Sequence, residues 1–276
     1  MDLGTAFEAA VARQPNSLAF VDGDVRRDFV SWQHDILRVA AGLSDLGLTR
    51  GDHLVCIMKN CYEMATLYWA CQMLAAVFTP FNWRATSDEL IFVLGDAEPS
   101  LVAFDEDVSH AMRVAIDSGS VSQGMLINVG DGLPGTSFAS LLYYDPLKSP
   151  VGAEDNEICL MLYTSGTTGR PKGVPRSHRA ERTAAASVIA HLRYQFCDSS
   201  LGVMPLFHTM GIRILLCSTM INGAIINMRG FKTVEALQLI EAEQINSLFL
   251  VPTMFHDMLG DKNFVSTDVS SVHNVA

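Results

Sequence analysis

Basic residues are scarce in this sequence. The chain has 276 residues, of which 19 are Lys or Arg and 30 are Asp or Glu, so its formal net charge is -11. A broad cationic surface for a DNA or RNA backbone is therefore not expected, because such binding depends on many basic side chains. Small anions remain possible ligands wherever basic residues are concentrated locally.

No secretory leader is expected, and a long apolar run is missing. The first five residues contain no basic stretch followed by an apolar one, which predicts a cytoplasmic protein. The most apolar helix-like run, residues 64–78, is shorter than the roughly 20 residues that a helix needs to cross a bilayer. We expect this run to form a buried helix and predict no membrane span.

Cysteine pairs of the kind that bind zinc are absent. The six cysteines form no CxxC pair and lie mainly in apolar segments, so neither a zinc site nor a disulfide framework is indicated. We expect reduced thiols in the core and no metal-ligating side chains. The six are Cys56, Cys61, Cys71, Cys159, Cys197 and Cys217.

The sequence does contain enough apolar material for a large core. Hydrophobic residues make up 49% of the chain and charged residues 18%, which favours one large domain or two closely packed ones. Helix and strand signals alternate, which predicts an α/β fold of layered, mainly parallel sheets flanked by helices. Residues 129–157 are rich in Gly, Pro, Ser, Asp and Asn, so we predict two α/β portions, 1–150 and 151–276.

Local signals place several elements. A hairpin is predicted at Asp22-Gly23, Ser31 is expected to cap a helix, and Thr86 and Glu89 have the spacing of a capping box. Further strands are expected at 53–58, 101–104, 158–163, 201–204, 224–228 and 247–251, and further helices at 61–76, at 180–194, after 207 and at 233–243.

One loop stands apart from the rest of the chain. Residues 163–174 read Tyr-Thr-Ser-Gly-Thr-Thr-Gly-Arg-Pro-Lys-Gly-Val and follow the apolar strand 158–162. Glycines allow backbone amides to approach a ligand closely, hydroxyls donate hydrogen bonds, and a lysine supplies charge. The loop therefore predicts a phosphate cradle at the carboxyl edge of a sheet, formed by Thr164, Ser165, Gly166, Thr167, Thr168, Gly169 and Lys172.

Basic residues are concentrated beside this loop, at Arg170, Lys172, Arg176, Arg179 and Arg182, with Glu181 as the one acidic residue among them. The alternative is a flexible turn followed by a solvated basic helix face. A Walker loop is excluded, because the two glycines are separated by only two residues and the lysine is followed by glycine.

Residues 163–174 resemble the phosphate-loop signature of the adenylate-forming superfamily, which includes acyl-CoA ligases, luciferases and peptide-synthetase adenylation domains. Residues 204–211, Met-Pro-Leu-Phe-His-Thr-Met-Gly, are similar to the motif that follows this loop in acyl- and aryl-CoA ligases. Weaker resemblances at Gly51-Asp52 with Asn60, and at 80–84 before Glu89-Leu90, extend the match over most of the chain. Residues 234–259 resemble benzoate- and 4-chlorobenzoate-type CoA ligases.

The resemblance implies an AMP-forming acid–thiol ligase. Such enzymes join a carboxylic acid to ATP, release pyrophosphate, and transfer the acyl group from the adenylate to the thiol of CoA. It implies that residues 164–169 hold the β- and γ-phosphates, that Lys172 is a charged catalytic partner, and that Mg²⁺ bridges phosphate oxygens. The implied partners are a small carboxylic acid, ATP and CoA.

His208 is the second catalytic candidate. Phe207-His208 resembles the aromatic gate beside the acyl carboxylate in CoA ligases, whereas a satisfied core histidine is the alternative. Amino-acid-activating relatives place aspartate after this phenylalanine, so the resemblance implies an acid without an α-amino group. Phe207, His208, Met210 and Phe249, with Ile212, are predicted to line the acyl pocket, and plain core positions are the alternative for the apolar ones.

The resemblance also implies parts that this sequence does not contain. The adenine-binding segment with its Mg²⁺-associated glutamate, the ribose-binding aspartate, the barrel, the hinge and the carboxyl-terminal domain with its catalytic lysine have no counterpart. We therefore expect an amino-terminal portion of a ligase that does not complete a turnover. The alternatives are a noncatalytic nucleotide- or anion-binding module and a scaffold with an inherited ligase fold. An unpaired strand edge at the end of the chain is expected to favour a homo-oligomer.

Overall fold

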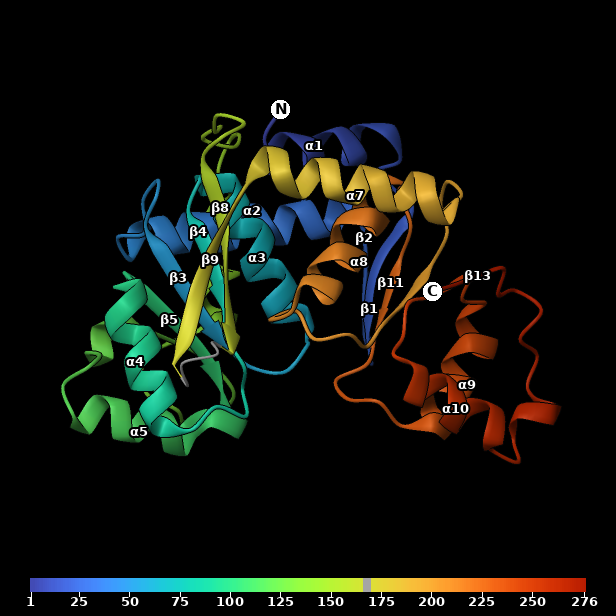
Figure 1. The fold of residues 1–276 in the computed structure, drawn as a ribbon. Coiled ribbons are helices and arrows are strands. Elements are labelled where there is room, and N and C mark those ends of the chain that lie inside the picture. The colour runs from blue at the N-terminus through green and yellow to red at the C-terminus, as the bar shows by residue number, and fades with distance from the viewer. Residues whose placement is uncertain (166–169) are drawn as a thin grey trace. The chain divides into compact units, whose positions relative to one another are not determined.

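The computed structural model describes residues 1–165 and 170–276, and this chain forms two compact units (Figure 1). Unit 1 comprises residues 1–5, 33–59 and 63–180, and unit 2 comprises residues 6–32, 60–62 and 181–276. The predicted boundary at residues 150 and 151 falls inside unit 1, since the segments on either side of it contribute strands to one sheet.

The described residues of unit 1 form a seven-stranded sheet in the order β7-β6-β5-β3-β4-β8-β9. Every neighbouring pair is parallel except β8 and β9, which form an antiparallel hairpin. The central strands are almost wholly apolar, as is typical of parallel strands that are covered on both faces. The strands are β3 (His53–Ile57), β4 (Val77–Pro80), β5 (Leu101–Asp105), β6 (Leu126–Val129), β7 (Thr136–Ser137), β8 (Ile158–Ser165) and β9 (Pro171–Ser177).

Helices of unit 1 include α4 (Ser87–Ala97) and α5 (Ser109–Asp117), which lie side by side (Figure 1). The predicted capping box is confirmed: Thr86 Oγ1 accepts the amide hydrogen of Glu89, and the Glu89 carboxylate accepts that of Thr86 at 2.9 Å. The apolar run at 64–78 forms the buried helix α3 (Tyr62–Leu74) and then enters β4. Shorter helices are η1 (Glu106–Val108), η2 (Gln123–Met125) and α6 (Phe138–Leu141).

The described residues of unit 2 form a six-stranded sheet in the order β13-β12-β10-β11-β1-β2. All pairs are parallel except β1 and β2, which are joined at the predicted Asp22-Gly23 hairpin, where Gly23 has a φ of 57°. The strands are β1 (Leu18–Asp22), β2 (Val25–Asp28), β10 (Ser200–Gly202), β11 (Ile225–Asn227), β12 (Ser247–Leu248) and β13 (Asn274–Val275).

Ser31 does not cap the following helix, contrary to the prediction. Helix α2 (Phe29–Asp45) begins two residues before Ser31, and the Asp28 carboxylate accepts the Ser31 amide hydrogen at 2.8 Å. Asp28 is therefore the N-cap. The remaining described helices are α1 (Leu3–Arg13), α7 (His178–Leu192), α8 (Thr209–Met220), α9 (Thr233–Glu243), α10 (Pro252–Gly260) and η3 (Phe264–Ser266).

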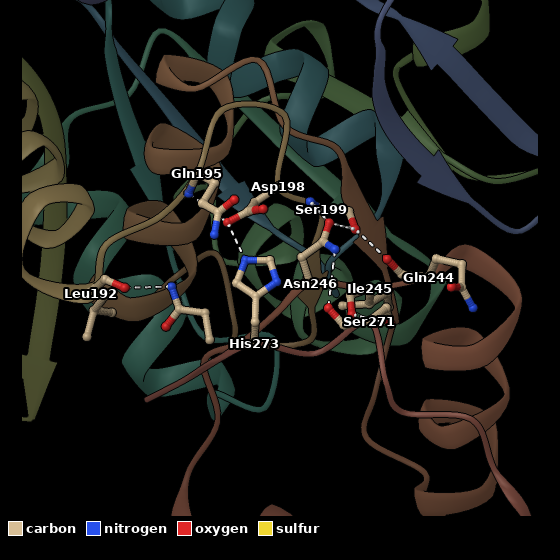
Figure 2. Close-up of polar contacts among 10 residues, drawn as sticks. Leu192, Gln195, Asp198, Ser199, Gln244, Ile245, Asn246, Ser271 and His273 are labelled. Carbon is tan, nitrogen blue, oxygen red and sulfur yellow. Dashed lines mark hydrogen bonds and ion pairs between the residues drawn. The ribbon is translucent and has the colours of Figure 1, made fainter.

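Side-chain hydrogen bonds hold the two short strands β12 and β13 of unit 2 (Figure 2). The Asn246 side chain accepts the Ser199 amide hydrogen at 2.9 Å and donates to the Ser271 carbonyl at 3.3 Å. His273 Nε2 lies 3.1 Å from Asp198 Oδ2. Because β12 and β13 have two residues each, these contacts supply connections that a long strand would obtain from its ladder.

None of the helices in the described ranges combines the length and the apolar character that crossing a membrane requires.

Candidate functional site

The predicted phosphate loop connects the two strands of the β8–β9 hairpin in unit 1. Strand β8 runs parallel to β4, so the loop leaves the sheet at the carboxyl edge, as predicted. Residues 166–169, which include Gly166, Thr167, Thr168 and Gly169, lie outside the described residues, and so does the side chain of Ser165. The flanking residues Thr164 and Lys172 are described and define the geometry of the hairpin mouth.

Lys172 lies in strand β9 and not in a loop, which corrects the predicted local structure. In the hairpin Thr164 is the cross-strand partner of Lys172, and directly opposite residues of an antiparallel pair point to the same face. Both side chains are exposed. A hydroxyl and an ammonium group are therefore presented to solvent together, on one face of the hairpin, next to the loop.

Tyr163 anchors the other face of the hairpin. Its phenol donates a hydrogen bond of 2.6 Å to Asp96 of α4, and its ring meets the Phe81 ring edge-on, with the centroids 5.9 Å apart. Gly173 is its cross-strand partner, and a Cβ on Gly173 would lie 3.3 Å from the Tyr163 ring. Burial, and then the hydrogen bond to Asp96, raise the pKa of Tyr163. The strand entering the loop is thus fixed to the unit by a neutral phenol.

A surface hollow of about 420 Å³ lies beside the same loop. The guanidinium of Arg170, the first described residue after the loop, lies 5.5 Å from the centroid of the Phe92 ring, in cation–π geometry. The hollow therefore combines apolar side chains with charged groups. Its lining consists of Asp88, Glu89, Ile91, Phe92, Arg170 and Pro171.

The basic run does not form one helix face. Arg170 precedes β9, Lys172 and Arg176 belong to β9, and Arg179 and Arg182 belong to α7. The acidic residue of the run is turned inward instead, because Glu181 is 1% exposed and lies 3.4 Å from the guanidinium of Arg213 in an ion pair. The alternative of a single solvated helix face is therefore wrong for the residues nearest the loop.

A cluster of charged side chains around Trp83, at the carboxyl edge of unit 1, was not predicted. Lys59, which follows β3, forms an ion pair of 2.8 Å with Asp107, and its ammonium lies 4.5 Å from the centre of the Trp83 ring. The Arg84 guanidinium lies 4.2 Å from the same ring. Asp105 accepts the Lys59 amide hydrogen at 3.2 Å, and burial raises the pKa of its carboxyl. The cluster could have been predicted from the rule that parallel strands bring their carboxyl ends to one edge, because Lys59 follows β3 and Trp83 follows β4.

Residues 204–211 of unit 2 lead from β10 into helix α8. His208 is the N-cap of this helix, and its Nδ1 accepts the Met210 amide hydrogen at 3.4 Å. The side chain is exposed, so His208 is not a core histidine. Because Nδ1 acts as the acceptor, the neutral ring carries its proton on Nε2, where it can donate a hydrogen bond.

The predicted pocket residues follow two neighbouring strands of unit 2, β10 and β12. Phe207 and Met210 are half-buried around the start of α8, and the half-buried Phe249 follows β12, which pairs with β10. Ile212, by contrast, is fully buried in the core. A small cavity of about 10 Å³ lies behind the motif and is lined in part by Leu206 and Gly211, but by none of the side chains predicted for the acyl pocket. The acyl pocket stays a prediction.

The thiols lie mostly in the core, as predicted. All six cysteines are free, and Cys197 is exposed whereas the other five are buried. Burial raises the pKa of Cys56 and Cys71, and raises that of Cys217 to about 12. These three thiols are therefore protonated and weakly reactive at neutral pH.

Within residues 1–165 and 170–276, no group of three or more His, Cys, Asp or Glu side chains is placed to hold a metal ion.

Comparison with known proteins gives a consistent result. The sequence profile of the AMP-binding enzyme family matches residues 7–276. Among curated relatives, 4-coumarate–CoA ligase 5 of Oryza sativa subsp. japonica is 33% identical over 247 residues, which cover 86% of this chain and 44% of that protein. The 4-chlorobenzoate–CoA ligase of Arthrobacter sp is 27% identical over 288 residues, which cover 98% of this chain and 52% of that protein.

A solved structure supports the same assignment of the fold. The inhibitor-bound N-terminal domain of FACL13 from Mycobacterium tuberculosis matches with a TM-score of 0.89 and 25% identity, covering 99% of this chain and 68% of that one. The predicted fold, the large N-terminal α/β domain of an acyl-CoA synthetase, is therefore confirmed, and so is the resemblance to acyl- and aryl-CoA ligases. The chain spans about half the length of the curated relatives that it matches.

Proposed function

Because the chain belongs to the AMP-binding enzyme family, we propose that it is the part of an acyl- or aryl-CoA ligase that binds ATP and a carboxylic acid. In the complete reaction a carboxylate oxygen attacks the α-phosphorus of ATP, the bond to pyrophosphate breaks, and the CoA thiol then displaces AMP from the acyl-adenylate. Two of the relatives are named for 4-coumarate and 4-chlorobenzoate, and on these names an aromatic carboxylic acid without an α-amino group is the proposed substrate.

The observation that carries the proposal is the pairing of Thr164 with Lys172 across the mouth of the hairpin. A hydroxyl and an ammonium group on one exposed face, beside a glycine-rich loop, are donors suited to phosphate oxygens. We assign the β- and γ-phosphates of ATP to residues 164–169 and Lys172. Their task is to stabilise the charge that accumulates on the departing pyrophosphate.

His208 is assigned to the acid. Its exposed ring at the start of α8 can donate from Nε2 to one carboxylate oxygen and leave the other free to attack phosphorus. Phe207, Met210 and Phe249 are assigned to the apolar part of the acid. Lys172 belongs to unit 1 and His208 to unit 2.

Mg²⁺ and CoA are parts of the proposal for the complete enzyme. Mg²⁺ would be held by the phosphate oxygens of ATP and would neutralise part of their charge. A cytoplasmic location is also proposed. It is supported by six free cysteines, which suit a reducing compartment.

The test is ATP–pyrophosphate exchange catalysed by this chain with a panel of aromatic and aliphatic acids, together with calorimetric titration with ATP–Mg²⁺. Exchange that depends on an aromatic acid, and that is slower in Lys172→Ala and in His208→Ala, is the expected result. Binding of ATP without exchange would favour the noncatalytic nucleotide-binding alternative. Neither heat nor exchange would overturn the proposal and leave a scaffold.

A further inference from the structure

The Asn60 side chain holds the backbone on both sides of Pro205. Its Nδ2 donates to the Met204 carbonyl at 2.8 Å, and its Oδ1 accepts the Leu206 amide hydrogen at 2.8 Å. Asn60 is 7% exposed, so both hydrogen bonds are shielded from water. Strand β10 ends at Gly202, and the amide of Asn60 gives the segment beyond it the pairing that a neighbouring strand would otherwise supply.

The segment fixed in this way carries His208. The His208 amide donates to the Pro205 carbonyl at 3.0 Å. Pro205, which lies between the two residues that Asn60 contacts, is therefore hydrogen-bonded to the backbone of His208. A Cβ on Gly211 would lie only 2.2 Å from the same Pro205 oxygen, which means that the first turn of α8 lies against it. A shift of residues 204–206 would therefore move both the N-cap and its helix.

Asn60 is itself held in place. Its carbonyl accepts from Asn227 Nδ2 at 3.2 Å, and the same Nδ2 lies 3.1 Å from an Asp22 carboxylate oxygen. Asp22 ends β1 and Asn227 ends β11, two adjacent parallel strands. Asn227 thus contacts the Asn60 carbonyl directly, and Asp22 contacts it through Asn227. All three residues belong to unit 2.

We propose that Asn60 is a positioning residue for His208, a role that rests on the proposed function of His208 at the acid carboxylate. An amide is required because the site needs one donor and one acceptor from a single planar group, and a carboxylate has no donor to offer the Met204 carbonyl. Asn60 acts through the backbone of residues 204–208 and does not contact the reacting atoms.

The variant that tests this role is Asn60→Asp, which retains the acceptor and loses the donor. Asn222→Asp is the matched control: Asn222 is also buried in unit 2, its Nδ2 donates to the Ala10 carbonyl at 2.7 Å, and its Oδ1 accepts from Arg13 Nε at 2.9 Å. Both substitutions therefore bury a carboxylate and remove one donor, but only Asn60 contacts the segment that leads to His208.

Two measurements on the whole chain separate positioning from general stability. Amide hydrogen exchange followed by NMR should be about tenfold faster at His208 in Asn60→Asp and unchanged in Asn222→Asp, as expected for the loss of a buried local hydrogen bond. The acid-dependent turnover number in ATP–pyrophosphate exchange should fall by about tenfold or more, while the Kd for ATP–Mg²⁺ stays the same, because only the acid contact is displaced.

A folded Asn60→Asp protein with wild-type exchange at the His208 amide would overturn the proposal, and so would equal losses in the Asn222→Asp control. If Asn60→Asp does not fold, Asn227→Ala removes the bond to the Asn60 carbonyl and should change the same two quantities in the same direction but less. A wild-type chain without acid-dependent turnover would refute the proposed function alone, because the His208 amide still reports on Asn60.

Discussion

The phenol of Tyr163 donates a 2.6 Å hydrogen bond to Asp96 and so ties the strand that enters the predicted phosphate loop to helix α4. We expect Tyr163→Phe to lower the free energy of unfolding by about 1 kcal/mol, the usual value for losing one such bond. Urea denaturation provides the measurement. Tyr143→Phe is the control, because Tyr143 is 88% exposed and should change stability very little.

The same contact makes stability depend on pH in alkali. Burial and the Asp96 hydrogen bond raise the pKa of Tyr163, so the neutral phenol stabilises the fold fully below the ordinary tyrosine pKa of about 10. This stabilisation is lost as the pH rises from there through the higher pKa of the folded state. The unfolding free energy of Tyr163→Phe should therefore fall less steeply above pH 10 than that of the wild type, and parallel curves would contradict the assignment.

Lys172 should contribute to nucleotide binding through its charge. We expect Lys172→Ala to raise the Kd for ATP–Mg²⁺ by about tenfold, and to slow acid-dependent exchange by about ten- to a thousandfold, as for the loss of a charge-assisted contact. Calorimetry and pyrophosphate exchange provide the two values. Lys232→Ala, which removes an exposed lysine of unit 2, should leave both unchanged. Equal behaviour of the two variants would remove Lys172 from the site.

Two helical glycines should respond in opposite directions to the same substitution. A Cβ at Gly211 would meet the Pro205 oxygen at 2.2 Å, so Gly211→Ala must push α8 away from residues 204–206. We expect a loss of about 2 kcal/mol or more in unfolding free energy, as for an overpacked core. Gly95 in α4 has open space around it, and Gly95→Ala should stabilise by roughly 0.5–1 kcal/mol through helix propensity. Thermal denaturation of both variants checks the signs.

Sequence reasoning succeeded where the determining contacts are local. The capping box of Thr86 and Glu89 joins residues three apart, and the Asp22-Gly23 turn depends on the conformational freedom of one glycine. The error at Ser31 has a local cause too, because Asp28 is an equally good cap. Strand β2 continues to Asp28, where it pairs with Leu18, and this pairing decides where α2 begins.

Strand β9 could not be predicted from its own residues. Two prolines and a glycine in seven residues are typical of a loop, since proline removes a ladder hydrogen bond. The segment is a strand because it pairs with β8 at the edge of the sheet, where proline is tolerated. Its seven-residue register placed Lys172 opposite Thr164, which no local signal indicates.

The role of Asn60 was equally hidden from the sequence. Its two side-chain hydrogen bonds reach residues 144 and 146 positions along the chain, and no periodicity or spacing records such contacts. The sequence indicates roles for the two motifs because their side chains are contiguous, and these roles stay predictions. Asp96 and Asn60, which hold the two motifs in place, belong to other parts of the chain. Their contacts could therefore be found only from the folded structure.

His53 should make the stability of the protein decrease in mild acid. It is half-buried at the start of β3, its Nδ1 lies 2.8 Å from the Thr79 hydroxyl, and burial lowers its pKa. The neutral ring therefore stabilises the fold above the ordinary histidine pKa of about 6.5, and this contribution is lost as the pH falls through the lower pKa of the folded state. His53→Gln should reduce the change in unfolding free energy between pH 7 and pH 5, measured by urea denaturation at each pH. His34→Gln, at an exposed histidine, controls for the loss of an imidazole. An equal reduction in both variants would show that burial of His53 is not the cause.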